Sequence, residues 1–224
     1  MRKLLFLAVM LVSSLAALAE DNYVSVGTAV SKDLKKATVN VDLTNNVQYV
    51  AFQMDIVFPS TMKVTSSAPT MTARLVDESG NVVNFTIAYQ MVDDYTLRVL
   101  AYNMDNRAIA GTSGDRLFSV TLTDANGIAT EAADWTPTLK DVLFVAAEDL
   151  METNLTAVSE TEGYLLGDVN EDGKVTALDI TATVAVIFKT SEASKYDAKK
   201  ADVNGDEKVT ALDVTKIVEI IFNE

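Results

Sequence analysis

The 224-residue chain contains no cysteine and no histidine, and it has a single tryptophan. Because a thiol and an imidazole are both missing, neither a cysteine nucleophile nor a Ser-His-Asp triad can be assembled. The nitrogen and sulfur ligands that zinc prefers are missing too. Without disulfides, an exported chain of this composition depends on core packing and bound metal for its stability.

Positive charge is scarce as well, since 18 Lys and Arg stand against 32 Asp and Glu and give a formal net charge of −14. Proteins that bind nucleic acid or anionic membranes do so through basic side chains. We therefore expect neither as a partner.

Residues 1–19 have the pattern of a secretory signal peptide. A basic pair, Arg2-Lys3, precedes an apolar run over residues 4–12, and the segment ends in Ala17-Leu18-Ala19. The last three residues form an A-x-A cleavage site, and the apolar run is too short to span a bilayer. Cleavage would move the formal charge to about −16. We predict a protein that is secreted, or held at the cell surface through a partner, with no membrane contact of its own.

A twelve-residue pattern occurs twice near the C-terminus, at residues 168–179 and 202–213, with an offset of 34 residues. Each copy places side-chain oxygens at positions 1, 3, 5, 9 and 12 and can offer the carbonyl of position 7, which is the pattern of a calcium loop. Magnesium would require near-ideal octahedral geometry with retained waters. The expected calcium ligands are Asp168, Asn170, Asp172, the Lys174 carbonyl, Thr176 through a water, and Asp179, then Asp202, Asn204, Asp206, the Lys208 carbonyl, Thr210 and Asp213.

Three carboxylates within a few ångströms of one point repel one another without a cation, so calcium binding should be coupled to folding of this segment. The alternative is a pair of solvated acidic turns, which does not account for a second copy in register. We expect the second site to be the weaker. Its position 6, where the backbone prefers positive φ, holds Glu207 where the first loop has Gly173.

Each loop should lead into a helix. Thr176 with Asp179, and Thr210 with Asp213, fit the capping box. Apolar residues then recur at helical spacing, so the two helices should pack on each other. These residues are Val214, Ile217, Val218 and Ile221 in the second copy, and Ile180, Thr183, Val184 and Ile187 in the first.

The pair of loop-helix units, with no room for a helix before residue 168, resembles a type I dockerin, and we assign residues 163–224 to it. The resemblance implies docking on a cohesin-type module of a polysaccharide-degrading assembly. It also implies a partner surface at loop positions 10 and 11 and along the helices. Here that surface would comprise Ala177, Leu178, Ala185, Lys189, Ala211, Leu212 and Glu219. Apolar pairs at positions 10 and 11 depart from the hydroxyl residues common in clostridial dockerins.

Residues 20–162 read as one antiparallel, jelly-roll-type β-sandwich, so the fold class is mainly β with a small all-α calcium domain at the end. Apolar and polar residues alternate from Val39 to Leu43 and from Val50 to Phe58. Further strands are expected at 85–90, 96–102, 117–122 and 139–146, with turns such as Gly111-Thr-Ser-Gly114 between them. Short strands at this spacing are typical of a sandwich.

The segments at 24–27, 38–44, 50–59, 114–122 and 138–145 resemble parts of a cohesin. Carbohydrate-binding modules share this sandwich, so a glycan-binding role is the main alternative. Its candidates are Trp135 and the strand tyrosines Tyr49, Tyr89 and Tyr102. We favour core packing at one end of the sandwich for Trp135, and ordinary sheet positions for the tyrosines.

A glycoside hydrolase is the less favoured alternative, because it needs two carboxylates across a cleft. Candidate acids are Asp55, Asp93, Asp94, Asp105 and Asp115, which are better explained as strand edges and turns. We therefore predict a secreted, non-catalytic, calcium-binding adaptor, with polysaccharide as a further candidate ligand.

Overall fold

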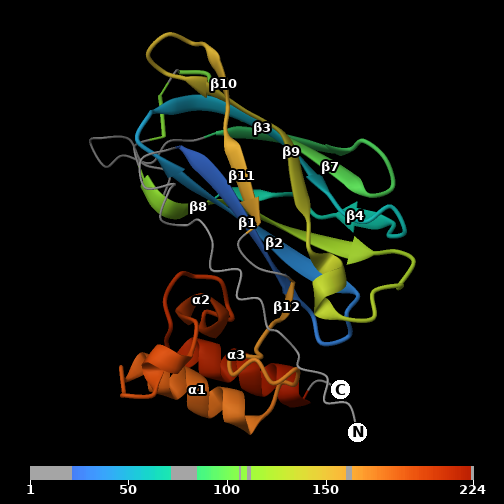
Figure 1. Cartoon of the computed structure of the whole chain (residues 1–224), viewed down its shortest axis with the longest axis vertical. Helices are drawn as coiled ribbons and strands as arrows, with labels where there is room; N and C mark the ends of the chain where they lie inside the picture. The colour runs from blue at the N-terminus through green and yellow to red at the C-terminus, as the bar shows by residue number, and fades with distance from the viewer. Residues whose placement is uncertain (1–21, 72–84, 106, 110–111, 160–162, 223–224) are drawn as a thin grey trace, which may run out of the picture.

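The computed structural model describes residues 22–71, 85–105, 107–109, 112–159 and 163–222. The expected signal peptide lies outside them. Figure 1 shows a β-sandwich followed by a small helical part, which lies beyond one end of the sandwich. No helix in the described ranges is both long enough and apolar enough to cross a membrane.

The described strands form two sheets. The first has the order β11-β1-β2-β8-β4, with β12 also on β1 and β5 also on β8, and the second has the order β10-β9-β3-β7-β6. The first sheet contains β1 (Tyr23–Val30), β2 (Lys36–Asn45), β4 (Val64–Ser66), β5 (Thr70–Met71), β8 (Thr112–Asp124), β11 (Thr156–Ser159) and β12 (Tyr164–Leu165). The second contains β3 (Tyr49–Val57), β6 (Thr86–Met91), β7 (Thr96–Tyr102), β9 (Thr138–Ala146) and β10 (Glu152–Asn154).

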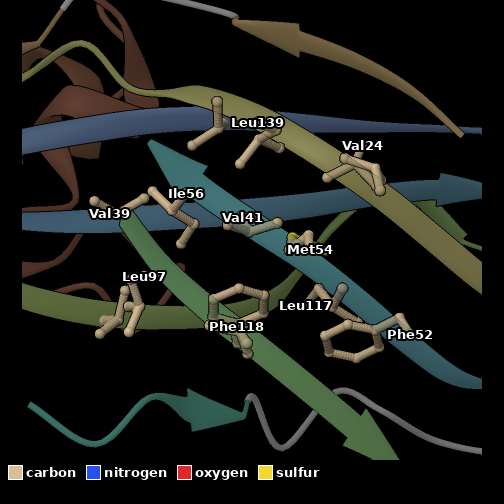
Figure 2. Packing of buried hydrophobic residues seen from close by; sticks show 14 of the residues in the cluster. Val24, Val39, Val41, Phe52, Met54, Ile56, Leu97, Leu117, Phe118 and Leu139 are labelled. Carbon is tan, nitrogen blue, oxygen red and sulfur yellow. The ribbon is translucent and has the colours of Figure 1, made fainter. Parts of the chain in front are cut away.

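The core lies between the sheets, where alternate residues of each strand point inward (Figure 2). Val39 and Val41 of β2 face Met54 and Ile56 of β3, as the alternation predicts. The ring of Phe52 spans the layers, with centroids 5.9 Å from Phe118 on β8 and 5.4 Å from Phe144 on β9. The mainly β sandwich with helices at the C-terminus is confirmed.

Two details of the sandwich differ from the expectation. β11 and β12 run parallel to β1, while the other pairs are antiparallel. Alternation shows which face a strand buries but not in which direction it runs. The turn expected at residues 111–114 is wrong, because β8 already begins at Thr112. Its pairing with β2 shifts register between Leu43 and Asn45, so this glycine-containing stretch lies in an irregular, bulge-like part of the strand.

Trp135 closes one end of the core, as expected. It ends the short 3-10 helix Ala132–Trp135, is fully buried, and meets Phe58 edge-on at 5.5 Å. Its indole Nε1 donates to the Leu34 carbonyl at 2.8 Å. The ring is therefore not available as a platform for a sugar.

The helical part contains α1 (Ala177–Ile187), a 3-10 turn (Ala193–Lys195), α2 (Ala198–Ala201) and α3 (Ala211–Phe222). α1 and α3 pack on each other, as expected. Their small core consists of Val169, Val175, Ala182, Ala201, Val203 and Ile217. The expected stripe on α3 is centred on Ile217, whereas α1 buries Ala182, Thr183 and Ala185 more deeply than its isoleucines.

Candidate calcium loops and docking surface

The two repeated loops are entered differently but end alike. The first follows β12 and a turn at Gly167, where φ is +94° and an added Cβ would lie 3.1 Å from Val175 Cγ1. The second follows α2 directly, because Asp202 is the C-cap of that helix. Both loops run into a long helix, α1 or α3, one residue after Thr176 or Thr210.

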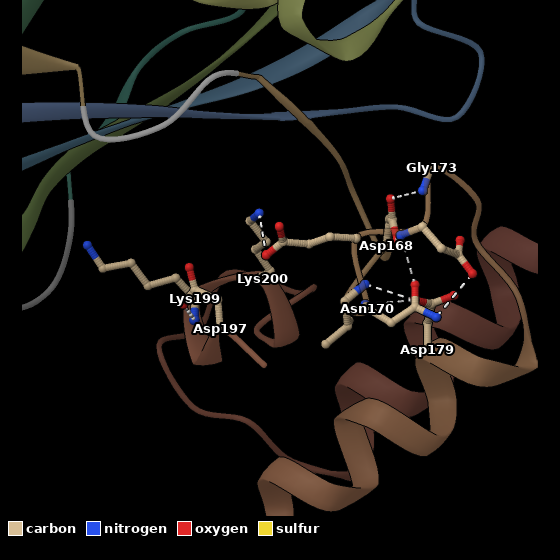
Figure 3. Close-up of polar contacts among 10 residues, drawn as sticks. Asp168, Asn170, Gly173, Asp179, Asp197, Lys199 and Lys200 are labelled. Carbon is tan, nitrogen blue, oxygen red and sulfur yellow. Dashed lines mark hydrogen bonds and ion pairs between the residues drawn. The ribbon is translucent and has the colours of Figure 1, made fainter. Parts of the chain in front are cut away.

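The acids at position 12 tie each loop to its helix. Asp179 and Asp213 are fully buried. One carboxylate oxygen of Asp179 accepts from the Val169 and Asn170 N–H groups at 2.9 and 3.1 Å, and the other accepts from the Thr176 N–H at 2.7 Å (Figure 3). The expected capping boxes are present in both copies.

The acids at position 1 accept hydrogen bonds from backbone N–H groups in the middle of each loop. Asp168 accepts the N–H groups of Asp172 at 3.1 Å and Gly173 at 2.9 Å. Burial raises the pKa of Asp168, the two N–H groups lower it, and the carboxylates of Asp179 and Asp172 raise it again. A buried carboxylate beside like charges is an environment that a cation would relieve.

The second copy repeats this arrangement. Asp202 accepts from Asp206 and Glu207 at 3.1 and 2.7 Å, and burial again raises its pKa, with the nearby Asp213 adding to the rise. Between the ends of each loop, the amide of position 3 donates to the acid of position 5. This bond is 3.1 Å from Asn170 to Asp172 and 3.2 Å from Asn204 to Asp206.

The donors in both loops suit calcium, since they are carboxylate, amide and hydroxyl oxygens on short loops that lead into helices. Within the described ranges, no three acidic side chains converge closely enough to hold a metal by themselves. In each loop the carboxylates instead accept N–H groups of the loop backbone. The amide, hydroxyl and backbone oxygens would therefore have to contribute to any ion site.

Backbone strain does not distinguish the two loops. Glu207 has φ of +68°, as expected for position 6. However, Glu171, at position 4 of the first loop, also has a positive φ of +60°, and Gly205 takes that position in the second loop with φ of +74°. Each loop therefore holds one glutamate and one glycine in the left-handed region. The strain that was expected to weaken the second site is therefore present in both loops, and the order of the two calcium affinities stays a prediction.

The expected docking residues lie on the surface of the helical part, with one exception. Leu178 and Leu212 are 62% and 64% exposed. The other exposed members of the expected set are Ala177, Lys189, Ala211 and Glu219. Ala185 is buried and cannot contribute to an exposed surface, and of the expected set only the two leucines are large, exposed apolar residues.

Two further exposed residues were not expected. Phe188 is 74% exposed at the C-cap of α1, and Phe222 is 79% exposed at the end of α3. They are related by the same 34-residue offset as the two leucines. The offset could have identified them from the sequence, since an exposed aromatic residue repeated in register marks an interaction surface better than an isolated one.

Three of the five candidate catalytic acids have structural contacts. Asp55 forms a two-pronged ion pair with Arg98, both bonds being 2.7 Å. Asp93 accepts the Tyr95 N–H in a turn, and Asp94 pairs with Lys63 at 3.3 Å. Asp105 is exposed, and the Asp115 side chain lies outside the described residues. Among the tyrosines, Tyr49 is buried, Tyr102 is half-buried and Tyr89 is exposed.

Comparison with known families supports the C-terminal resemblance, because residues 166–221 match the dockerin type I domain. Dockerin type I domains generally bind calcium. A comparison with curated proteins gives no match.

Solved structures similar to this chain include cohesin modules. One is a non-cellulosomal cohesin from Archaeoglobus fulgidus (12% identity, 61% of this chain, 86% of that chain, TM-score 0.43). Another is the sixth cohesin of Acetivibrio cellulolyticus scaffoldin B in complex with a dockerin (14%, 62%, 94%, 0.44). A third is a type I cohesin-dockerin complex from Clostridium thermocellum (14%, 62%, 95%, 0.45). Likenesses at this level carry no inference about function.

Proposed function

We propose that the C-terminal domain binds two calcium ions and docks the chain on a cohesin-type module, so that the protein is a secreted, non-catalytic adaptor in a polysaccharide-degrading assembly. The observation that supports this most strongly is the in-register repeat of loop, capping box and exposed apolar residues within the segment that matches the dockerin type I domain. The sandwich is then the module that docking would place on the partner.

Each loop would use its own residues to hold an ion. Asp168, Asn170 and Asp172, with the Lys174 carbonyl, Thr176 and Asp179, would surround the first, and the matching residues of the second loop would surround the other. A bound calcium would neutralise carboxylates that are otherwise crowded and partly desolvated. The start of each helix would be fixed as a result, because Asp179 and Asp213 belong to both the loop and the cap.

The exposed leucine and phenylalanine of each half form the surface proposed for docking. We call Leu178 with Phe188 the first patch, and Leu212 with Phe222 the second patch. Because the two halves repeat in sequence and local structure, either patch could contact the same site on a partner. The two modes of docking would differ by about half a turn.

Affinity capture tests this proposal. The chain from residue 20 onward is immobilised and exposed to the secreted fraction of the source organism in calcium or in chelator, and bound proteins are identified by mass spectrometry. We expect a protein with a cohesin-type module to be retained in calcium and released by chelator. Retention on insoluble glycan that chelator does not change would instead indicate a carbohydrate-binding module.

Variants test the patches. Leu178→Asp or Leu212→Asp alone should lower capture about twofold at most, because the other patch remains. Both changes together should abolish capture while circular dichroism in calcium stays unchanged. Ile128→Asp, on an exposed part of the sandwich, is the matched control. If the double variant still captures the partner, the assignment of the docking surface is wrong.

A further inference from the structure

The short helix α2 contacts three other parts of the chain. Ala201 is fully buried in the core of the helical part. Lys199 Nζ lies 3.5 Å from Asp42 Oδ2 on β2 of the sandwich. Lys200 Nζ lies 3.0 Å from Glu171 Oε1 in the first calcium loop, and Figure 3 shows Lys199 and Lys200 leaving α2 in different directions. α2 is thus anchored in one core and reaches two separate elements.

The sandwich offers Lys199 a carboxylate that is already fixed in place. Asp42 is largely buried on the first sheet, and its other oxygen accepts from the guanidinium of Arg116 on β8. Arg116 in turn donates to Asn40 at 2.8 Å. This network holds Asp42 in place, so Lys199 meets a carboxylate whose position is already set by the sandwich.

Tyr164 on β12, the strand that pairs with β1, provides a second contact for α2, through Lys200. Its ring lies under Lys200, with Nζ 5.2 Å from the ring centroid, in the geometry of a cation-π interaction. Burial raises the pKa of Tyr164 to about 12, and the carboxylate of Asp197, the N-cap of α2, adds to the rise. The ring is therefore half-buried between the end of the sandwich and the segment that leads into the second loop.

Both calcium loops determine the position of α2. Asp202 ends α2, with its N–H bonded to the Ala198 carbonyl at 3.1 Å, and it is also position 1 of the second loop. Glu171 belongs to the first loop and holds Lys200. Clefts of about 730 and 770 Å³ lie at the junction, and Tyr164 and Lys200 line both of them.

We propose that α2 is a calcium-dependent clamp: with both loops loaded it holds the helical domain in one orientation on the sandwich, and loss of calcium releases it. This inference rests on the proposed calcium binding. It adds an intramolecular contact, made by Lys199 with Asp42 and by Lys200 with Tyr164, on a surface separate from the two patches. Calcium would then set the direction in which those patches face.

Spin-label distances test the clamp, and the cysteine-free chain allows two unique labels. Glu148→Cys on the sandwich and Ser191→Cys on the helical part are both at exposed positions. We expect one narrow distance distribution in calcium and a distribution at least twice as broad in chelator. Lys199→Glu, which places a negative charge against Asp42, should give the broad distribution even in calcium. The matched control, Lys195→Glu, disrupts only a local pair with Glu192 and should keep the narrow one.

Calorimetric titration of the same samples separates the two proposals. If Lys199→Glu binds two calcium ions with unchanged helicity yet keeps the narrow distribution, the clamp is wrong and the calcium proposal stands. The clamp is also wrong if wild type binds calcium but has the same distribution in calcium and chelator. If wild type binds no calcium, the proposed calcium binding is wrong, and so is the clamp that rests on it. A broad distribution with intact calcium binding in Lys199→Glu alone supports the clamp.

Discussion

The two halves of the helical domain carry the same candidate ligands and caps, but they place glycine at different positions of the loop. Both loops need a left-handed residue at positions 4 and 6. The first places Glu171 and then Gly173 there, and the second places Gly205 and then Glu207. One glycine per loop is thus used at either of two positions. The second loop has glutamate in place of glycine at position 6, and it has glycine in place of glutamate at position 4.

The halves also differ in the chain that enters them. A strand and a glycine turn precede the first loop, so that Gly167 lies where the second half has Ala201 at the end of α2. Tyr164 lies in the first of these segments, and its 34-residue counterpart is Ala198. The loops are alike, and their attachments to the rest of the molecule are not. Three experiments test how far the two halves are equivalent.

The largest effect should come from removing the acid at position 12. Asp179→Ala and Asp213→Ala each leave at least two buried or part-buried N–H groups without that acceptor, which should cost roughly 3 kcal/mol of stability even without calcium. Each variant should also lose one calcium ion. Thermal unfolding in chelator and titration with calcium measure the two effects.

Asp172→Ala is the control, because this exposed acid bonds only within its own loop among the contacts described. It should weaken calcium binding with a much smaller loss of stability in chelator. If Asp179→Ala and Asp213→Ala differ by more than about 2 kcal/mol, the halves are not equivalent in the way that their hydrogen bonds suggest.

A second effect should be specific to the first half. The pKa of Tyr164 is about 12 in the folded chain against about 10 for a free tyrosine, so the folded state holds the phenol proton more tightly. The protonated phenol therefore adds up to roughly 2 to 3 kcal/mol to the free energy of unfolding. This stabilisation is complete below pH 10 and is lost as the pH rises from 10 to 12. Tyr164→Phe, which keeps the ring, should flatten the fall in stability across that window.

Denaturant unfolding at pH 9 and pH 11.5 measures this difference, and absorbance near 295 nm follows the phenol directly. Tyr89→Phe, at an exposed position, is the control and should leave the fall in stability unchanged. A Tyr164 that titrates with the other tyrosines would show that the ring is open to solvent.

The smallest effect should come from the glutamates in the left-handed region. Glu207→Gly should relieve roughly 1 kcal/mol of strain and tighten calcium binding by about fivefold. Glu171→Gly should gain less, because it also loses the ion pair with Lys200, whose side chain is only 13% exposed. Calorimetric titration compares the sites. If Glu207→Gly tightens one site and Glu171→Gly weakens the other by tenfold, the pairing with Lys200 outweighs strain.

Much of this architecture could be predicted from the sequence, because the signals were local. Alternation identified β2 and β3, and Thr and Asp at a spacing of three identified the starts of α1 and α3. The buried position of Trp135 was also expected. Each of these features depends on residues close in sequence, whose preferences for a helix, a strand or a buried site are nearly independent of the rest of the fold.

Features set by distant contacts could not be predicted. The parallel direction of β11 and β12 depends on where the chain re-enters the first sheet, and no local pattern records that. α2 has only four residues, and its contacts with Asp42 and Tyr164 join positions that are far apart in sequence. The positive φ of Glu171 was not expected, because the calcium-loop pattern indicates a left-handed residue at position 6 but not at position 4.

The parallel pairing of β11 and β12 with β1 has a mechanical consequence. β1 begins the described part of the sandwich, and β11 and β12 lie beside it just before the chain leaves for the helical domain. A pull between the start of β1 and the end of β12 would slide parallel strands past each other along their length. The hydrogen bonds between them would then share the load instead of opening one after another, so this pairing would resist tension where the sandwich joins the helical domain.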